Sequence, residues 1–220
     1  MNRPARTLIA SLALTSLSLS CAFAGGSSSG SQVLNGQITL STQWSNLDTT
    51  VKGAGGDVGV QGQAAGNLID ITTMNDTMVR NNQLVGPGAT IGSDVTAKVG
   101  NVGGSVGIQN QTVCNGASVS ADPTVTAITS SQECRANDPS SQITAKVGNV
   151  AGDVGIAGVS IGNSLEADSN APNMPIHNSQ INAATGTSTV NATVHNVSGA
   201  VGVSSSAVGN TAQIIHYSTN

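Results

Sequence analysis

Apolar positions along this chain alternate with small polar ones, a period of two that predicts β-strands. Ala97 and Val99 alternate before a glycine-rich segment, and Val106 and Ile108 alternate after it. A further alternating run, Val113–Val119, carries an asparagine among its apolar residues. Alternation of β-branched residues interrupted by glycine is typical of strands joined by tight turns. The density of Gly, Val, Thr, Ser and Asn disfavours helix.

This pattern recurs along the chain at a nearly constant interval. The segment Thr96–Val102 is repeated identically at Thr144–Val150. The longer motif Val-x-Asn-Val-x-Gly-x-Val-Gly-Ile/Val begins at Val99, Val147 and Val194, and a weaker copy begins at Val51, so the period is 48, 48 and 47 residues. Fixed self-similarity of this length indicates a repeat architecture. We therefore divide the chain into a signal peptide (1–24), a tether with a first strand (25–47) and a β domain of four units (48–94, 95–142, 143–189 and 190–220).

Asparagines occur at fixed places in each unit. One stands 16 residues after each starting valine, at Asn67, Asn115, Asn163 and Asn210; a second set is Asn101, Asn149 and Asn196, expected to share a face with Ala97 and Val99. A buried amide is costly when it has no partner. At a strand spacing of about 4.8 Å, stacked amides can bond to one another. We expect both sets to form structural ladders.

The predicted fold is all-β, a parallel β-solenoid in which each unit supplies about two short coils. The alternative is a series of exposed hairpins in which the Gly-Asn pairs form type I′ turns. The variable stretches Thr72–Gly92, Ser120–Ser140 and Ser169–Thr187 are expected to be loops projecting from one side. Three similar triplets lie within these stretches or at their edges and indicate a degenerate second coil: Asn82-Gln83-Leu84, Ser141-Gln142-Ile143 and Ser179-Gln180-Ile181.

The first 24 residues predict export. Arg3 and Arg6 precede the short apolar run Leu8–Leu19, and Ala22-Phe23-Ala24 matches a signal-peptidase site with cleavage before Gly25. The alternative is lipoprotein processing at Cys21. Residues 25–31 are rich in Gly and Ser and are expected to form a flexible tether. After cleavage, Cys114 and Cys134 remain, and in an oxidising compartment they are expected to form a disulfide.

Composition narrows the function classes. Charged residues make up 8% of the chain and aromatic residues 1%, so a core of large side chains is not expected. Without Arg3 and Arg6, five basic residues face 11 acidic ones, a formal charge of −6. Such a chain lacks the basic surface that nucleic acid requires.

Motifs for catalysis or metal binding are weak. Gly158–Gly162 matches the nucleophile elbow around Ser160, but Ala64, Thr112 and Ala207 occupy the equivalent positions. A calcium turn at Asp57 would need an acid in every unit, and the series is Asp57, Ser105, Asp153 and Ala200. Single histidines (His177, His195, His216) and scattered acids (Asp122, Glu133, Glu166, Asp168) complete the candidates. We predict no enzyme, no cofactor and no metal.

The pattern Val-Gly-Ile/Val-x5-Gly-Asn-x3-Leu/Ile behind a signal peptide resembles the curli-like and holdfast-anchor surface proteins of stalked alphaproteobacteria, over Thr49–Ile215. The curlin pattern Ser-x5-Gln-x-Gly-x2-Asn-x-Ala-x3-Gln is absent. The resemblance implies an extracellular protein at the outer membrane, with sister anchor proteins, a secretion channel and adhesive polysaccharide as partners.

We therefore expect an exported adhesion or anchoring protein at the cell surface, with self-association into a fibre. The alternative is a secreted β-solenoid that binds or acts on polysaccharide. A third hypothesis, a phage or secretion-system fibre segment, predicts a trimer.

Overall fold

The structure is a computed structural model that describes residues 31–217 except 75, 122–125 and 171–172. The signal peptide, Cys21, most of the tether and Asp122 lie outside this part. The described residues form 12 strands and no helix, which confirms the all-β prediction. This part of the chain accordingly holds no helix able to span a membrane.

The strands form three parallel sheets of four strands each. The first sheet contains β1 (Ser31–Thr39), β4 (Thr77–Val85), β7 (Thr126–Cys134) and β10 (Ile176–Asn182). The second contains β2 (Gln43–Ala54), β5 (Thr90–Val102), β8 (Asn137–Val150) and β11 (Thr187–Val197). The third contains β3 (Val58–Thr73), β6 (Val106–Ala121), β9 (Val154–Ser169) and β12 (Val201–His216).

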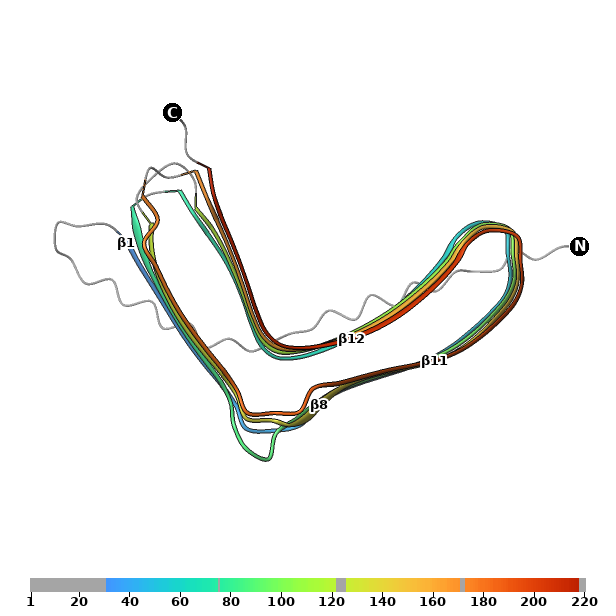
Figure 1. Cartoon of the computed structure of the whole chain (residues 1–220), viewed down its shortest axis with the longest axis horizontal. Coiled ribbons are helices and arrows are strands. Elements are labelled where there is room, and N and C mark those ends of the chain that lie inside the picture. Colours follow the sequence, from blue (N-terminus) through green and yellow to red (C-terminus); the bar gives the residue numbers. More distant parts are fainter. Residues whose placement is uncertain (1–30, 75, 122–125, 171–172, 218–220) are drawn as a thin grey trace, which may run out of the picture.

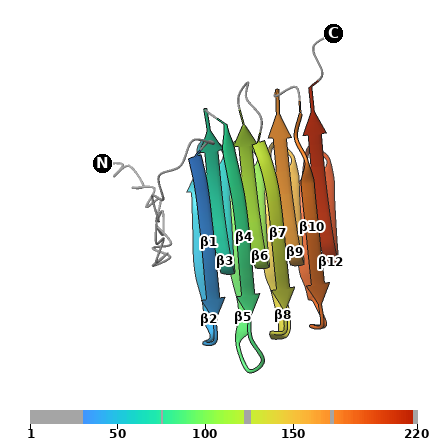
Figure 2. The ribbon, with the colours of Figure 1, turned by 90° about the vertical axis from the view of Figure 1, so that its left-hand side faces the viewer.

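Three consecutive strands make one coil, and four coils stack side by side from β1–β3 to β10–β12 (Figure 2). We number them coil 1 (31–73), coil 2 (77–121), coil 3 (126–169) and coil 4 (176–216). The prediction of two short coils per unit is wrong, because the strands of one coil together use the whole 48-residue period. The hairpin alternative is also wrong: Gly66 and Asn67 lie inside β3, which pairs in parallel with β6.

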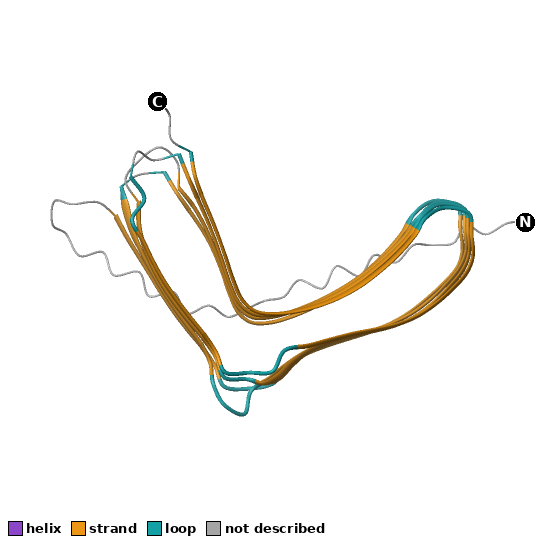
Figure 3. Cartoon of the chain, viewed as in Figure 1, coloured by secondary structure: helices purple, strands orange, loops and turns teal. Residues whose placement is uncertain are grey.

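Each coil has a V-shaped outline when viewed along the stack (Figure 1). The strands of the third sheet bend and run along both arms, while the first and second sheets each cover one arm (Figure 3). The arm with the second sheet is filled by valine, isoleucine and alanine, including Val99, Val147, Ile108 and Ile156. The other arm buries a smaller apolar cluster of Ile71, Val79, Val119, Ile128 and Ala167.

The bend in the third sheet coincides with a change in which residues face inward. In β6, Ile108 and Thr112 are buried, and the next residue, Val113, is buried as well, so the inward positions shift by one. In β3, the residue directly after the equivalent shift is Gly66. A Cβ there would lie 2.6 Å from the carbonyl oxygen of Cys114, so only glycine lets the neighbouring backbone approach this closely.

The variable stretches contain strands, which corrects the prediction that they are loops. In β4, the inward residues Thr77, Val79, Asn81, Gln83 and Val85 are buried, so three of the five buried positions are polar. This polarity conceals the alternation in the sequence. The triplets around Gln83 and Gln180 do lie in register, but their partner in coil 3 is Gln132 and not Gln142.

Cys114 and Cys134 form the predicted disulfide. Cys114 lies in β6 of coil 2 and Cys134 in β7 of coil 3, so the bond links successive coils at the corner of the V. Both residues are fully buried and pack with Val85, Ala89 and Ile91.

Replacing both cysteines, as Cys114→Ala with Cys134→Ala, should lower the free energy of unfolding by about 3 kcal/mol, the chain-entropy value for a loop of this size. Urea denaturation followed by circular dichroism measures the change. Because both residues are buried, the intact protein should also resist mild reductants. An unchanged unfolding midpoint in the double variant would contradict this prediction.

Candidate functional site

The interior of the stack contains a continuous column of asparagines, the first candidate site. Asn67 Nδ2 donates to Asn115 Oδ1 at 2.8 Å, and Asn115 and Asn163 donate to the next asparagine at 2.7 Å each. Each amide also donates to a main-chain carbonyl in a strand of the first sheet, at 2.9–3.3 Å. Asn115 and Asn163 are fully buried. This asparagine column therefore satisfies its own polar groups while joining all four coils.

A second column, of glutamines, was not predicted from the sequence. Gln83, Gln132 and Gln180 each donate to the glutamine of the preceding coil at 2.8–2.9 Å, ending at Gln37. Their other N–H groups, and that of Gln37, reach carbonyls of the third sheet at 2.8–3.0 Å. The asparagine column reaches from the third sheet towards the first, and this glutamine column reaches back, so the two hold one arm together.

The two columns have opposite directions. Asparagine donors point from coil 1 towards coil 4, and glutamine donors point from coil 4 towards coil 1. The neighbouring main-chain carbonyls determine this direction, because each requires an N–H group and so fixes which side of the amide carries nitrogen.

The second predicted set, Asn101, Asn149 and Asn196, does not face inward. These side chains are exposed and stack outside the core, with Asn149 donating to Asn101 at 2.9 Å and Asn196 to Asn149 at 3.0 Å. All three have positive φ values of 52–56°, and Gly53 takes this position in coil 1 with φ 74°. Left-handed backbone favours asparagine and glycine, and it turns the side chain away from the face of Ala97 and Val99.

The residues considered for catalysis or calcium take part in structural hydrogen bonds. Ser160 is fully buried, and its hydroxyl donates to the Pro139 carbonyl at 3.0 Å. Asp57 Oδ1 accepts from the Ser105 N–H at 2.7 Å, and Asp153 Oδ1 accepts from the N–H of Ala200 at 2.8 Å. Among the described residues, no group of three His, Cys, Asp or Glu residues is arranged to hold a metal ion.

The remaining acids and histidines do not gather on one face. Glu133 projects from the first sheet and pairs with Arg135, whereas Glu166 projects from the third sheet on the opposite outer face of the same arm. Asp168 accepts from the Ser120 hydroxyl at 3.1 Å. The three histidines lie on β10, β11 and β12, one in each sheet.

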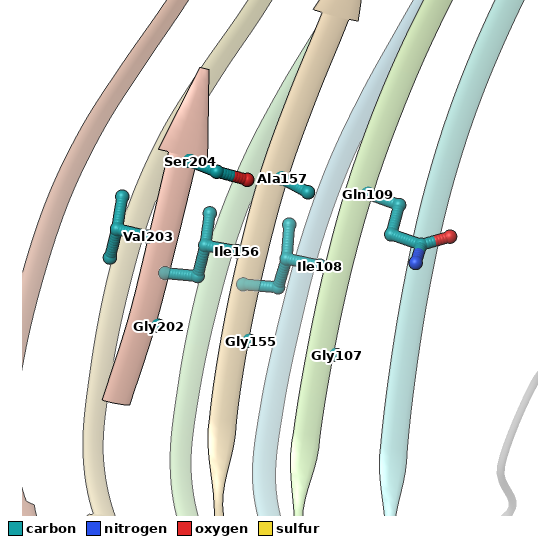
Figure 4. Close-up of a pocket in the computed structure, with 9 residues that line it drawn as sticks. All are labelled: Gly107, Ile108, Gln109, Gly155, Ile156, Ala157, Gly202, Val203 and Ser204. Atoms are coloured by element: carbon teal, nitrogen blue, oxygen red, sulfur yellow. The ribbon is translucent and has the colours of Figure 1, made fainter. Parts of the chain in front are cut away.

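A shallow depression lies on the outer face of the third sheet, inside the V. Figure 4 shows three rows of lining residues across β6, β9 and β12: a glycine row, a row of Gln109, Ala157 and Ser204, and a row of Ile108, Ile156 and Val203, whose side chains point to the other side of the sheet. The hollow arises because Gly107, Gly155 and Gly202 carry no side chains. None of its nine lining residues is ionisable, so it offers packing surface and no acid–base chemistry.

Comparison with protein-family models, with curated proteins and with solved structures gave no match. The main feature of the structure that bears on function is therefore the pair of amide columns, whose buried polar side chains connect one coil to the next.

Replacing a central rung of the asparagine column should destabilise the fold strongly. Asn115→Leu leaves Asn163 Oδ1 and the Glu133 carbonyl without donors, and each unsatisfied buried group costs about 1–3 kcal/mol. We expect the free energy of unfolding to fall by about 3 kcal/mol or more in urea titration. Asn210→Leu, at the exposed end of the same column, is the matched control and should cost clearly less. Equal losses in both variants would contradict the ladder interpretation.

The exposed asparagines should be sensitive to backbone conformation. Asn149→Ala should lower the free energy of unfolding by about 1–2 kcal/mol, because alanine is disfavoured at positive φ. Asn149→Gly should cost less, since Gly53 already occupies this position in coil 1. Thermal or urea unfolding of the two variants gives the comparison; equal losses for alanine and glycine would contradict the backbone explanation and point to the side-chain hydrogen bonds that both variants lack.

Proposed function

We propose that this chain is an exported structural protein that anchors or adheres material at the cell surface and associates with copies of itself. The observation that carries the proposal is the use of buried polar residues: both amide columns serve cohesion between coils along their whole length. Rigid length and exposed surface are what such a stack provides. The signal-peptide pattern of residues 1–24 supports export.

The expected partners are further copies of this chain, outer-membrane anchor or secretion proteins, and surface polysaccharide. The outer face of the stack is rich in small polar residues, which suits contact with a hydrated polymer. Lys98 and Lys146 are paired neighbours on the outer face of the second sheet, and both are exposed. They provide a chemical handle for testing where the protein is located.

On intact producing cells, a membrane-impermeant amine reagent should label Lys98 and Lys146, as read by mass spectrometry of the recovered protein. Deleting the gene should reduce attachment of cells to a surface, and expression of the whole chain should restore it. A chain that lacks residues 1–24 should fail to restore attachment. Unlabelled lysines on intact cells, or normal attachment after deletion, would refute the proposal.

A further inference from the structure

The two ends of the stack leave unpaired groups that complement one another. Coil 4 exposes Val201, Val203 and Ile214 at 49%, 51% and 50% of their surface. Their register partners in coil 3, Val154, Ile156 and Ala167, are at most 2% exposed. Each earlier coil is covered by the next coil in the stack. Coil 4 carries the same kind of core residues, but no further coil covers them.

The backbone at both ends is also unpaired within the described chain. At one end β10, β11 and β12 have a parallel neighbour on only one side, and at the other end the same holds for β1, β2 and β3. Unpaired strand edges are templates for pairing with another chain. The facing edges are similar in length: β3 and β12 each contain 16 residues, β2 and β11 contain 12 and 11, and β1 and β10 contain 9 and 7.

The amide columns end in complementary groups. At coil 4, Asn210 retains an N–H group, and Gln180 Oε1 accepts no hydrogen bond from the described residues. At coil 1, Gln37 retains an N–H group because its other one bonds the Leu68 carbonyl. Asn67 Oδ1 accepts from the Thr39 hydroxyl and has a second lone pair available.

We propose that copies of this chain stack head to tail and in register, with coil 4 of one copy covering coil 1 of the next. Asn210 then donates to Asn67 of the next copy, and Gln37 of that copy donates back to Gln180. Both columns continue with unchanged direction across the junction. The proposal gives a specific geometry to the self-association in the proposed function, on which it rests.

Charge favours this polarity over head-to-head contact. Coil 4 (176–216) contains no Asp, Glu, Lys or Arg, so it brings no formal charge to the junction at neutral pH. Coil 1 contains Asp48, Asp57 and Asp70 with a single Lys52. Two coils of this kind facing each other would bring six aspartates together.

Cysteine cross-linking tests the junction. In register, Ser204 lies over Gln61 of the next copy, at the parallel-strand spacing of about 4.8 Å, which a disulfide can bridge. Within one chain, two strands separate these residues, by about 14 Å in total. Purified exported chains that carry Ser204→Cys and Gln61→Cys separately should, when mixed and oxidised at neutral pH, give mainly the mixed dimer. Homodimers as the main product, or no dimer, would overturn the proposal.

Three variants sharpen the test. Gln63→Cys, shifted by two residues and about 8 Å from Ser204, should lose the cross-link if the register is correct. Val203→Lys, added to the Ser204→Cys chain, should abolish the mixed dimer, because its charge would be buried at the junction. Ser206→Lys is the matched control on the outer face of the same strand and should leave the dimer intact. Equal loss in both lysine variants would contradict burial at this end.

Failure of the stacking is distinguishable from failure of the proposed function. If no variant cross-links but deletion of the gene still abolishes cell attachment, the protein acts as a single anchor and the head-to-tail junction is wrong. If the mixed dimer forms and attachment is unaffected by deletion, the junction stands and the anchoring function is wrong.

Discussion

The structure depends on the requirement that polar groups inside a narrow stack find partners. A V-shaped coil with thin arms has room for few large side chains, and its interior includes asparagine, glutamine, serine and threonine. Water cannot satisfy these groups, so each amide of the two columns bonds the equivalent amide one coil away and a carbonyl across the arm. Any one coil alone would leave these groups unsatisfied. These polar residues can therefore be buried only because an equivalent residue recurs one repeat period away, in the neighbouring coil.

The V shape and the glycines at its bend accompany a change of the inward face in the third sheet. The third sheet runs along both arms, which needs a shift of one residue in the inward face where the strand bends. Small residues at the bend let successive backbones come close, and in coil 2 the equivalent position is Cys114, which forms the covalent link to coil 3. Shape, column and disulfide are therefore concentrated at one corner of the coil.

Much of this fold was predictable from the sequence, because alternation and a constant period reveal stacked strands and place Asn115 over Asn163. The glutamine column was missed since its members are separated by 46, 49 and 48 residues and have dissimilar neighbours. The alternating pattern also placed Asn101 on the wrong face of its strand. Its left-handed backbone turns the side chain outward, and nothing in the residue types reveals this. The sequence did not reveal that one repeat period makes one coil, because the polar residues at inward positions of β4 hid that strand.

The opposed directions of the two amide columns have an electrostatic consequence. Each side-chain amide carries a dipole, and a single column of aligned amides would add a dipole moment with every rung. Here four asparagines point one way and four glutamines point the other, so the two contributions largely cancel. Lengthening the array by further coils would thus build up no growing field along the axis from these side chains.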